Sequence, residues 1–438
     1  MLKNCQDSKV TKDNSNLNKI DEQDRAFHDW YRFVLSYPPH LVRDYIENFR
    51  LNEKQVILDP FCGTGTTLVE SKLWGIPSWG IEANPFAHFA TSVKIDWDVD
   101  PDLLYSHSRE VAELALDLLR QQGIEDSVPF AGNIADLPLH QLSPEQNKLI
   151  LSGSISPIPL HKVLVLLECL EKYKIEKVYR HQLLAIANVL VFTASNLRFG
   201  PEVGVGKSTV DAAIIGTWIA KINEMAENLR RVKGQSFAPT RAYLADARGI
   251  DKVLPPQSVD AVITSPPYPN EKDYTRITRL ESVILGFIKT KADLQAFKKV
   301  LIRSNTRNVY KADDDDRWIQ DYPEIQAIAN RIERRRIELG KTSGFEKLYG
   351  RVTKLYFGGM ARHLAALRSV LRPDAQLAYV VGDQASYLRV MIRTGQLLAE
   401  IAQSLGYEFV RTDLFRTRFA TGTKEQLREE VVILRWRG

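Results

Sequence analysis

At residues 59–67 the chain of 438 residues reads Asp59-Pro60-Phe61-Cys62-Gly63-Thr64-Gly65-Thr66-Thr67, and this stretch decides its fold class. The run that leads into it, QVILDP at 55–60, predicts a buried strand, and TTLVESKLW at 66–74 predicts a helix. The glycines of the turn between them let the backbone approach a ligand closely. The spacing differs from the six-residue dinucleotide fingerprint, so NAD binding fits it poorly.

A second strand is predicted at 78–83 (SWGIEA), with Glu82 near its end, 23 residues after Asp59. An acidic side chain at this strand end is placed to accept hydrogen bonds from ribose hydroxyls. Strand, helix and strand in this order predict a parallel βαβ unit with a right-handed crossover. Five further strands are expected, the last two as a terminal hairpin: 241–246, 259–264, 375–383, 408–417 and 430–437.

The second motif is Thr264-Ser265-Pro266-Pro267-Tyr268, directly after the apolar run AVI at 261–263. Its prolines stiffen the segment and leave carbonyl groups free of a strand partner. Tyr268 can stack on a planar base, while Ser265 and the Pro266 carbonyl accept hydrogen bonds from an exocyclic amine. Taken alone such a segment is more often a turn, and its significance comes from the pairing with the glycine loop.

The two motifs together resemble those of the S-adenosylmethionine-dependent methyltransferases that modify exocyclic amino groups of DNA bases. Residues 59–67 are similar to their cofactor-binding FxGxG motif and 264–268 to their catalytic [D/S/N]PP[Y/F] motif, while SYPPHL at 36–41 resembles the segment at the methionine end of the cofactor. The resemblance implies a catalytic loop of Ser265, Pro266, Pro267 and Tyr268. It also implies that the cofactor is S-adenosylmethionine and that no metal is needed. The implied cofactor contacts are Tyr37, Pro38, Asp59, Phe61, Gly63, Gly65, Thr66, Thr67, Glu82, Asp246 and Thr264.

The family fold that this resemblance implies is an α/β, Rossmann-like sheet of seven mostly parallel strands with a C-terminal antiparallel hairpin, here with helical insertions. The implied partner is double-stranded DNA, and the target base must leave the stack to reach the site. In this family a serine at position 265 is mostly associated with N4-cytosine methylation, so we expect cytosine, with N6-adenine as the alternative. Methylation of the cytosine ring needs a cysteine in a Pro-Cys pair, and none of Cys5, Cys62 and Cys169 fits that pattern.

Two rival functions use the same motifs. Guanine-N2 methyltransferases of RNA have a very similar glycine loop, but they normally carry an N-terminal RNA-binding domain, for which we expect no room before the core. A non-catalytic nucleic-acid-binding protein that kept the fold is the other rival. The intact set of Asp59, Glu82, Asp246, Ser265 and Tyr268 argues against it.

The resemblance covers a core that two insertions divide. The expected parts are a tail at 1–22, core segments at 23–96, 236–290 and 371–438, a helical insertion at 97–235 and a basic, mostly helical insertion at 291–370. Either insertion is a candidate for recognising DNA.

The net charge of +5 is distributed unevenly. Residues 275–370 hold 20 Lys and Arg against 11 Asp and Glu, whereas the remainder is slightly acidic. Positive charge of this kind binds phosphates, although RIERRRIE at 331–338 also fits a self-paired, solvated helix face. The candidate nucleic-acid contacts are Arg198, Lys207, Arg276, Arg279, Lys298, Lys299, Arg303 and Arg307.

The segment Gly206-Lys207-Ser208-Thr209 resembles the end of a phosphate-binding P-loop. The glycine required five positions before Gly206 is replaced by Pro201, so nucleotide triphosphate binding fits poorly. We expect instead a polar loop that caps a helix starting at Ser208.

The composition fits a globular protein in a reducing compartment, with 44% hydrophobic residues and three widely spaced cysteines. The N-terminal residues have no apolar segment typical of a signal peptide, and no apolar run approaches the ~18 residues that cross a bilayer. We therefore expect a cytoplasmic, nucleoid-associated protein with no membrane partner; the sequence leaves its oligomeric state open.

Overall fold

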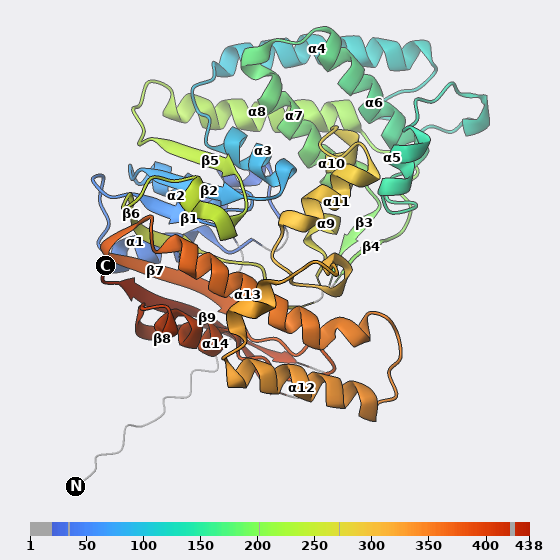
Figure 1. Cartoon of the computed structure of the whole chain (residues 1–438). Helices are drawn as coiled ribbons and strands as arrows, with labels where there is room; N and C mark the ends of the chain where they lie inside the picture. Colours follow the sequence, from blue (N-terminus) through green and yellow to red (C-terminus); the bar gives the residue numbers. More distant parts are fainter. Residues whose placement is uncertain (1–19, 34–35, 201, 271, 421–424) are drawn as a thin grey trace.

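The centre of the molecule is a seven-stranded sheet in the order β5-β2-β1-β6-β7-β9-β8 (Figure 1). The computed structural model describes residues 20–33, 36–200, 202–270, 272–420 and 425–438. The strands of the sheet are β1 (Ile57–Asp59), β2 (Ser78–Glu82), β5 (Thr240–Leu244), β6 (Val259–Thr264), β7 (Leu371–Gly382), β8 (Glu408–Ala420) and β9 (Glu425–Trp436).

The first five strands of this order are parallel, and β9 runs antiparallel to both β7 and β8. This arrangement confirms the predicted fold class, including the terminal hairpin. Strand β7 begins at Leu371 instead of residue 375, because Leu371 already pairs with Val259 across a register shift, and β9 begins at Glu425 instead of residue 430.

Alternating apolar side chains give the sheet two buried faces. Ile57 and Ile263 lie in the cluster beneath α1 (Pro39–Asn48), and α2 (Thr66–Leu73) packs against α1. Leu58 and Val262 point to the opposite cluster. The elements over this second face are η6 (Ala247–Lys252), α13 (Tyr349–Leu367) and α14 (Thr394–Ser404).

Residues 97–235 form a mainly helical layer on one side of the sheet, shown at the top of Figure 1. Its helices are α4 (Pro101–Gln121), α5 (Pro144–Leu149), α6 (Pro157–Lys172), α7 (Glu176–Val189) and α8 (Ile214–Val232). Helix α3 (Pro85–Lys94) of the core lies beneath them. The sequence did not indicate the small hairpin of β3 (Leu197–Phe199) and β4 (Val203–Val205).

The helix that we expected from Ser208 begins at Ile214, so this prediction was wrong. Asp126 caps it from a distant loop, because its carboxylate accepts the backbone N–H groups of Ile214, Ile215 and Gly216 at 2.8, 3.1 and 2.9 Å. A cap supplied 88 residues away leaves no local signal.

Residues 274–370 run from beside the catalytic motif to the sheet. They contain α9 (Tyr274–Ile277), α10 (Arg279–Ile284), α11 (Lys291–Val300), η8 (Asp315–Ile319), α12 (Pro323–Glu338) and α13. We expected α13 inside the basic insertion, but it packs on the sheet, because its inward side chains are apolar and fully buried, among them Val352, Leu355 and Phe357. No helix within the described ranges is long and apolar enough to span a membrane.

Candidate active site

Asp59 is the buried anchor of the glycine loop. Its carboxylate accepts the hydroxyl groups of Thr264 at 2.6 Å, Thr67 at 2.8 Å and Tyr37 at 3.0 Å, and the backbone N–H of Phe61 at 3.0 Å. Burial raises the pKa of Asp59, and these hydrogen bonds oppose the shift. We expected Asp59 to contact the cofactor directly, but the structure turns its carboxylate toward protein donors, where it joins β1, β6 and the loop.

The glycines of the loop are required by its shape. Gly65 has φ of +85°, and a Cβ atom there would lie 2.8 Å from the Thr91 side chain. Thr91 donates its hydroxyl to the Gly63 carbonyl at 2.7 Å, and Lys94 donates to the Thr64 carbonyl at 2.8 Å. Both contacts come from α3, so this helix fixes the loop from behind.

Glu82 lies at the carboxyl end of β2, beside the glycine loop. One of its oxygens accepts the Gly63 N–H at 2.8 Å, and the other accepts the Asn84 N–H at 2.7 Å. Burial raises the pKa of Glu82 to about 7, although both hydrogen bonds favour the charged form. Each oxygen keeps a second lone pair, so the ionised carboxylate can still accept two hydroxyl groups of a ribose.

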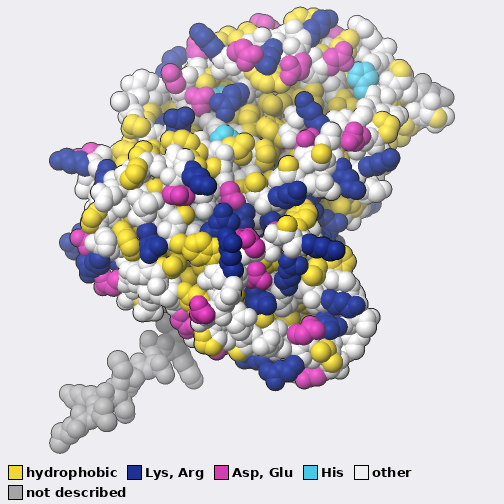
Figure 2. Space-filling model, viewed as in Figure 1, with side chains coloured by type: hydrophobic (Ala, Val, Ile, Leu, Met, Phe, Trp, Pro, Cys, Tyr) yellow, Lys and Arg dark blue, Asp and Glu magenta, His cyan; other side chains and the backbone are white. Residues whose placement is uncertain are grey.

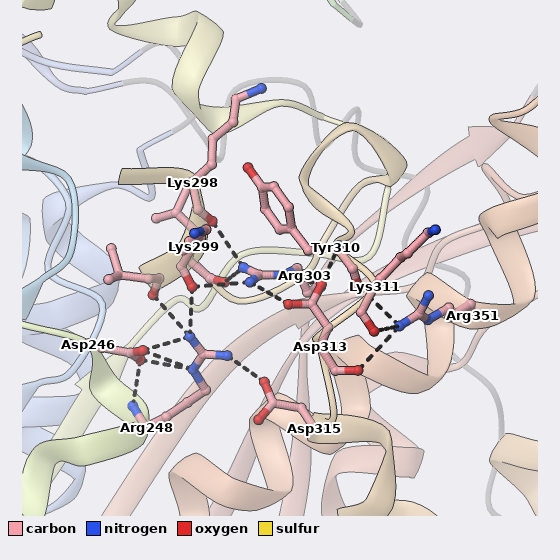
Figure 3. A network of polar contacts seen from close by, with 12 residues as sticks. Asp246, Arg248, Lys298, Lys299, Arg303, Tyr310, Lys311, Asp313, Asp315 and Arg351 are labelled. Atoms are coloured by element: carbon pink, nitrogen blue, oxygen red, sulfur yellow. Dashed lines mark hydrogen bonds and ion pairs between the residues drawn. The ribbon is translucent and has the colours of Figure 1, made fainter. Parts of the chain in front are cut away.

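Asp246 follows β5 and is part of the buried ion-pair network of Figure 3. Its carboxylate accepts the Arg248 guanidinium at 2.6 Å, and Arg248 also pairs with Asp315 of η8. The Asp246 side chain is 28% exposed, which leaves part of it open to the neighbouring cavity. The network therefore joins a predicted cofactor contact to residues 291–370.

The Ser265–Tyr268 loop follows β6 directly. Ser265 donates its hydroxyl to the Val380 carbonyl at 3.3 Å, so its lone pairs are available as acceptors. The Tyr268 N–H donates to the Tyr274 hydroxyl at 3.2 Å, and the Tyr268 hydroxyl donates to Glu429 of β9 at 3.0 Å. Strand β9 therefore helps to hold the ring that we expected to stack on a base.

A single cavity of about 300 Å³ joins the two motifs. The predicted site residues that line it are Tyr37, Phe61, Gly63, Thr66, Glu82, Asp246, Ser265, Pro266, Pro267 and Tyr268. The predicted residues outside its lining are Pro38, which precedes α1, and Asp59, Gly65, Thr67 and Thr264, which support the wall. The groups of the cofactor motif and of the catalytic motif thus face one space.

The cavity also contains residues that sequence reasoning missed. Its apolar wall includes Phe297, Val300, Leu301 and Ile302, from the end of α11 and the segment after it. Its polar part includes Asn270, Lys272, Arg416, Arg418 and Glu429. The only sequence signal for the second set was its mixture of charges near the motif and on the expected hairpin.

Four of the predicted nucleic-acid contacts have exposed or partly exposed side chains on or around the β3–β4 hairpin. Arg198 and Lys207 are exposed on and after the β3–β4 hairpin. Arg276 and Arg307 both lie 3.4 Å from Glu202 of the same hairpin. Glu202 therefore joins the 97–235 layer to the segments beside the catalytic loop.

Three other predicted nucleic-acid contacts, Lys298, Lys299 and Arg303, are drawn in Figure 3, and two of them pair with acidic residues of the protein. Arg303 is buried, pairs with Asp313 at 2.8 Å and donates to the carbonyl groups of Lys298 and Lys299. The Lys298 ammonium lies 3.7 Å from Asp273. Only Lys299 of these has an exposed side chain and no ion pair within the part of the chain that the structure describes.

Arg279 is also directed inward, donating to the carbonyl groups of Thr275 and Leu149 at 3.1 and 3.3 Å. On α12 three of the four arginines pair with glutamates of the same helix: Arg331 with Glu324, Arg335 with Glu338 and Arg336 with Glu333. Several cations of the segment that we expected to grip DNA are thus paired within the protein. Figure 2 shows Lys and Arg side chains gathered across the middle of this face, between the helical layer above and α12 and α13 below.

Comparison with known proteins agrees with this geometry. A family model described as DNA methylase, of the N6/N4 methyltransferases, matches residues 3–91. The Type II methyltransferase M.BsoBI of Geobacillus stearothermophilus is 23% identical over 445 residues, which cover 94% of this chain and 85% of the relative. The Type II methyltransferase M.AvaI of Nostoc sp. is 25% identical over 405 residues, covering 86% and 78%.

A shorter match, to the Type II methyltransferase M.MjaII of Methanocaldococcus jannaschii, is 28% identical over 130 residues, or 30% of this chain and 21% of the relative. Together the matches bear out the resemblance to the DNA methyltransferases that modify exocyclic amino groups. Within the described ranges, no group of three or more His, Cys, Asp and Glu side chains is arranged to hold a metal ion.

Proposed function

We propose that the protein transfers the methyl group of S-adenosylmethionine to the N4 amino group of a cytosine extruded from double-stranded DNA. The observation that carries this proposal is the single cavity that Gly63, Glu82, Ser265 and Tyr268 line together. Transfer between a cofactor and a base requires that both enter one space, with water largely excluded.

The residues at one end of the cavity fit the cofactor. Glu82 offers free lone pairs for the ribose hydroxyls, and Asp246 offers an acceptor for the adenine amino group. The apolar wall at Val300, Leu301 and Ile302 suits a planar ring. When bound, S-adenosylmethionine supplies an electrophilic methyl group, so the protein needs to position the base more than to activate it.

The other end fits the target amine. An exocyclic amine is a weak nucleophile, because its lone pair is delocalised into the ring. Hydrogen bonds from this amine to Ser265 and to the Pro266 carbonyl increase the electron density on nitrogen as it attacks. Tyr268 stacks on the base, and such stacking contributes about 1–3 kcal/mol.

The serine at position 265 favours cytosine over adenine on the strength of the family resemblance. The hydrogen bond from Ser265 to Val380 supports its part as an acceptor. By their names the relatives are Type II methyltransferases, and we propose the same place for this chain, as the modification enzyme of a restriction–modification system.

The test is incubation with labelled cofactor and either unmethylated genomic DNA or total tRNA, followed by mass spectrometry of the nucleosides. Label in N4-methylcytosine is the expected result. Label in N6-methyladenine would correct the base, and label only in RNA would overturn the substrate class. If no label is transferred, calorimetry with S-adenosylmethionine distinguishes two explanations. An enzyme that was given the wrong substrate still binds the cofactor, whereas a protein that only binds nucleic acid does not.

A further inference from the structure

The terminal hairpin β8–β9 contributes charged side chains to the mouth of the cavity. Arg416 and Arg418 come from β8, Glu429 comes from β9, and Lys272 comes from the segment after the catalytic loop. We infer that Lys272, Arg416 and Arg418 form a binding site for the phosphate groups that flank the extruded nucleotide. This inference rests on the proposed function and names the part of the chain that holds the target strand.

The charges of this cluster favour an anion. Arg416 pairs with Glu429, whereas neither Lys272 nor Arg418 forms an ion pair with any described residue. Lys272 and Arg418 line the same cavity. Burial and then the positive charge of Arg418 lower the pKa of Lys272, with Glu429 acting in the opposite direction. A phosphate would relieve this repulsion.

The position of the cluster fits the geometry of base extrusion. An extruded nucleotide carries its two flanking phosphates away from the duplex axis and toward the pocket that takes its base. Cations at the mouth of that pocket, on the same cavity as Tyr268, are where those phosphates arrive. The exposed cations Arg198 and Lys207 lie on and just after the β3–β4 hairpin, and they suit the duplex outside the cavity.

The same cluster is joined to the stacking ring. Glu429 accepts the Tyr268 hydroxyl at 3.0 Å and pairs with Arg416. Gly382 stands opposite Glu429 in the β7–β9 pairing, and a Cβ atom there would lie 3.0 Å from the Tyr268 ring. The ring is therefore held between a glycine and one carboxylate, which makes Glu429 a positioning residue that connects the phosphate site to the base site.

The experiment measures methyl transfer from labelled cofactor to long unmethylated phage DNA over a series of KCl concentrations. Each lost phosphate contact reduces the slope of log(kcat/KM) against log[KCl] by about one. We expect this reduction for Arg418→Gln and for Lys272→Gln, with cofactor affinity unchanged. For Glu429→Gln we expect a lower kcat with unchanged cofactor affinity.

Arg411→Gln is the matched control, because Arg411 is an exposed arginine of β8 that pairs with Asp413 and lies outside this cavity. It should keep the wild-type salt slope. The inferred phosphate site is wrong if Arg418→Gln and Lys272→Gln also keep the wild-type salt slope. It is equally wrong if these variants lose affinity for DNA while their salt slope stays unchanged. If the wild-type protein transfers no label to DNA, the proposed function itself fails, and this shows before any variant is compared.

Discussion

We expect cofactor binding to depend on pH through Glu82. Burial raises its pKa to about 7 in the ligand-free protein, and only the ionised carboxylate accepts hydrogen bonds from both ribose hydroxyls. With that pKa, about one tenth of the molecules are ionised at pH 6 and about nine tenths at pH 8. Because the apparent affinity scales with the competent fraction, it should fall about tenfold from pH 8 to pH 6.

The assay is titration calorimetry with S-adenosylhomocysteine, the demethylated product of the cofactor, in buffers of different ionisation enthalpy. At pH 6 binding should release a proton, because the ligand-free protein is mostly protonated at Glu82 and the complex is not. At pH 8 this release should nearly vanish. Glu82→Gln loses a charged acceptor, which is worth about 1.5–3 kcal/mol, so its affinity at pH 8 should be about 10- to 150-fold lower and nearly independent of pH.

Glu281→Gln is a matched control for this experiment. Burial also raises the pKa of Glu281 to about 7, but its partner is the Tyr31 hydroxyl and it does not line the cavity. It should leave the pH dependence of cofactor binding intact. Our assignment of Glu82 is refuted if the wild-type affinity is constant from pH 6 to pH 8, or if Glu82→Gln binds as tightly as the wild type at pH 8.

Three further changes test other parts of the site. Gly65→Ala should abolish measurable cofactor binding by calorimetry, because the new Cβ would meet the Thr91 side chain at 2.8 Å in a left-handed backbone; unchanged affinity would contradict the tight loop. Tyr268→Ala should reduce kcat by about 5- to 150-fold, the worth of one stacked base, while the cofactor Kd stays within about twofold; normal turnover would exclude it as the stacking residue. Glu202→Gln should free two arginines and raise the affinity for duplex DNA a few-fold at low salt, measured by fluorescence anisotropy, with the difference lost at high salt.

The strand ends were predictable because their signals are local. Asp59, Glu82, Asp246 and Ser265 each follow a short apolar run, and in a parallel sheet such positions meet at one edge. The position of Asp59 at a strand end did not predict the direction of its carboxylate, which is set by hydroxyl groups from three other segments. A motif identifies the residue type at a strand end, but burial decides whether its side chain faces the ligand or the protein.

The remaining site residues had no local signal. Glu429 lies 161 residues after Tyr268, and only the pairing of β7 with β9 brings it to that ring. The wall at Val300, Leu301 and Ile302 comes from a segment whose sequence indicated only a basic helix. The position of Glu429 depends on strand pairing within the core, and the wall depends on how residues 291–370 fold back on the core. The spacing of the motifs determines neither.

The charge count also had limited value for predicting the residues that bind DNA. Composition counts every cation, whereas phosphate binding depends on the cations that have no acidic partner in the protein. Residues 275–370 carry the surplus, yet α12 pairs three of its four arginines with its own glutamates, and Arg303 is buried against Asp313. Lys272 and Arg418, which have no ion pair among the described residues, come from segments on either side of that range. The phosphate site that we infer is thus assembled by tertiary structure, from residues outside the segment with the largest net charge.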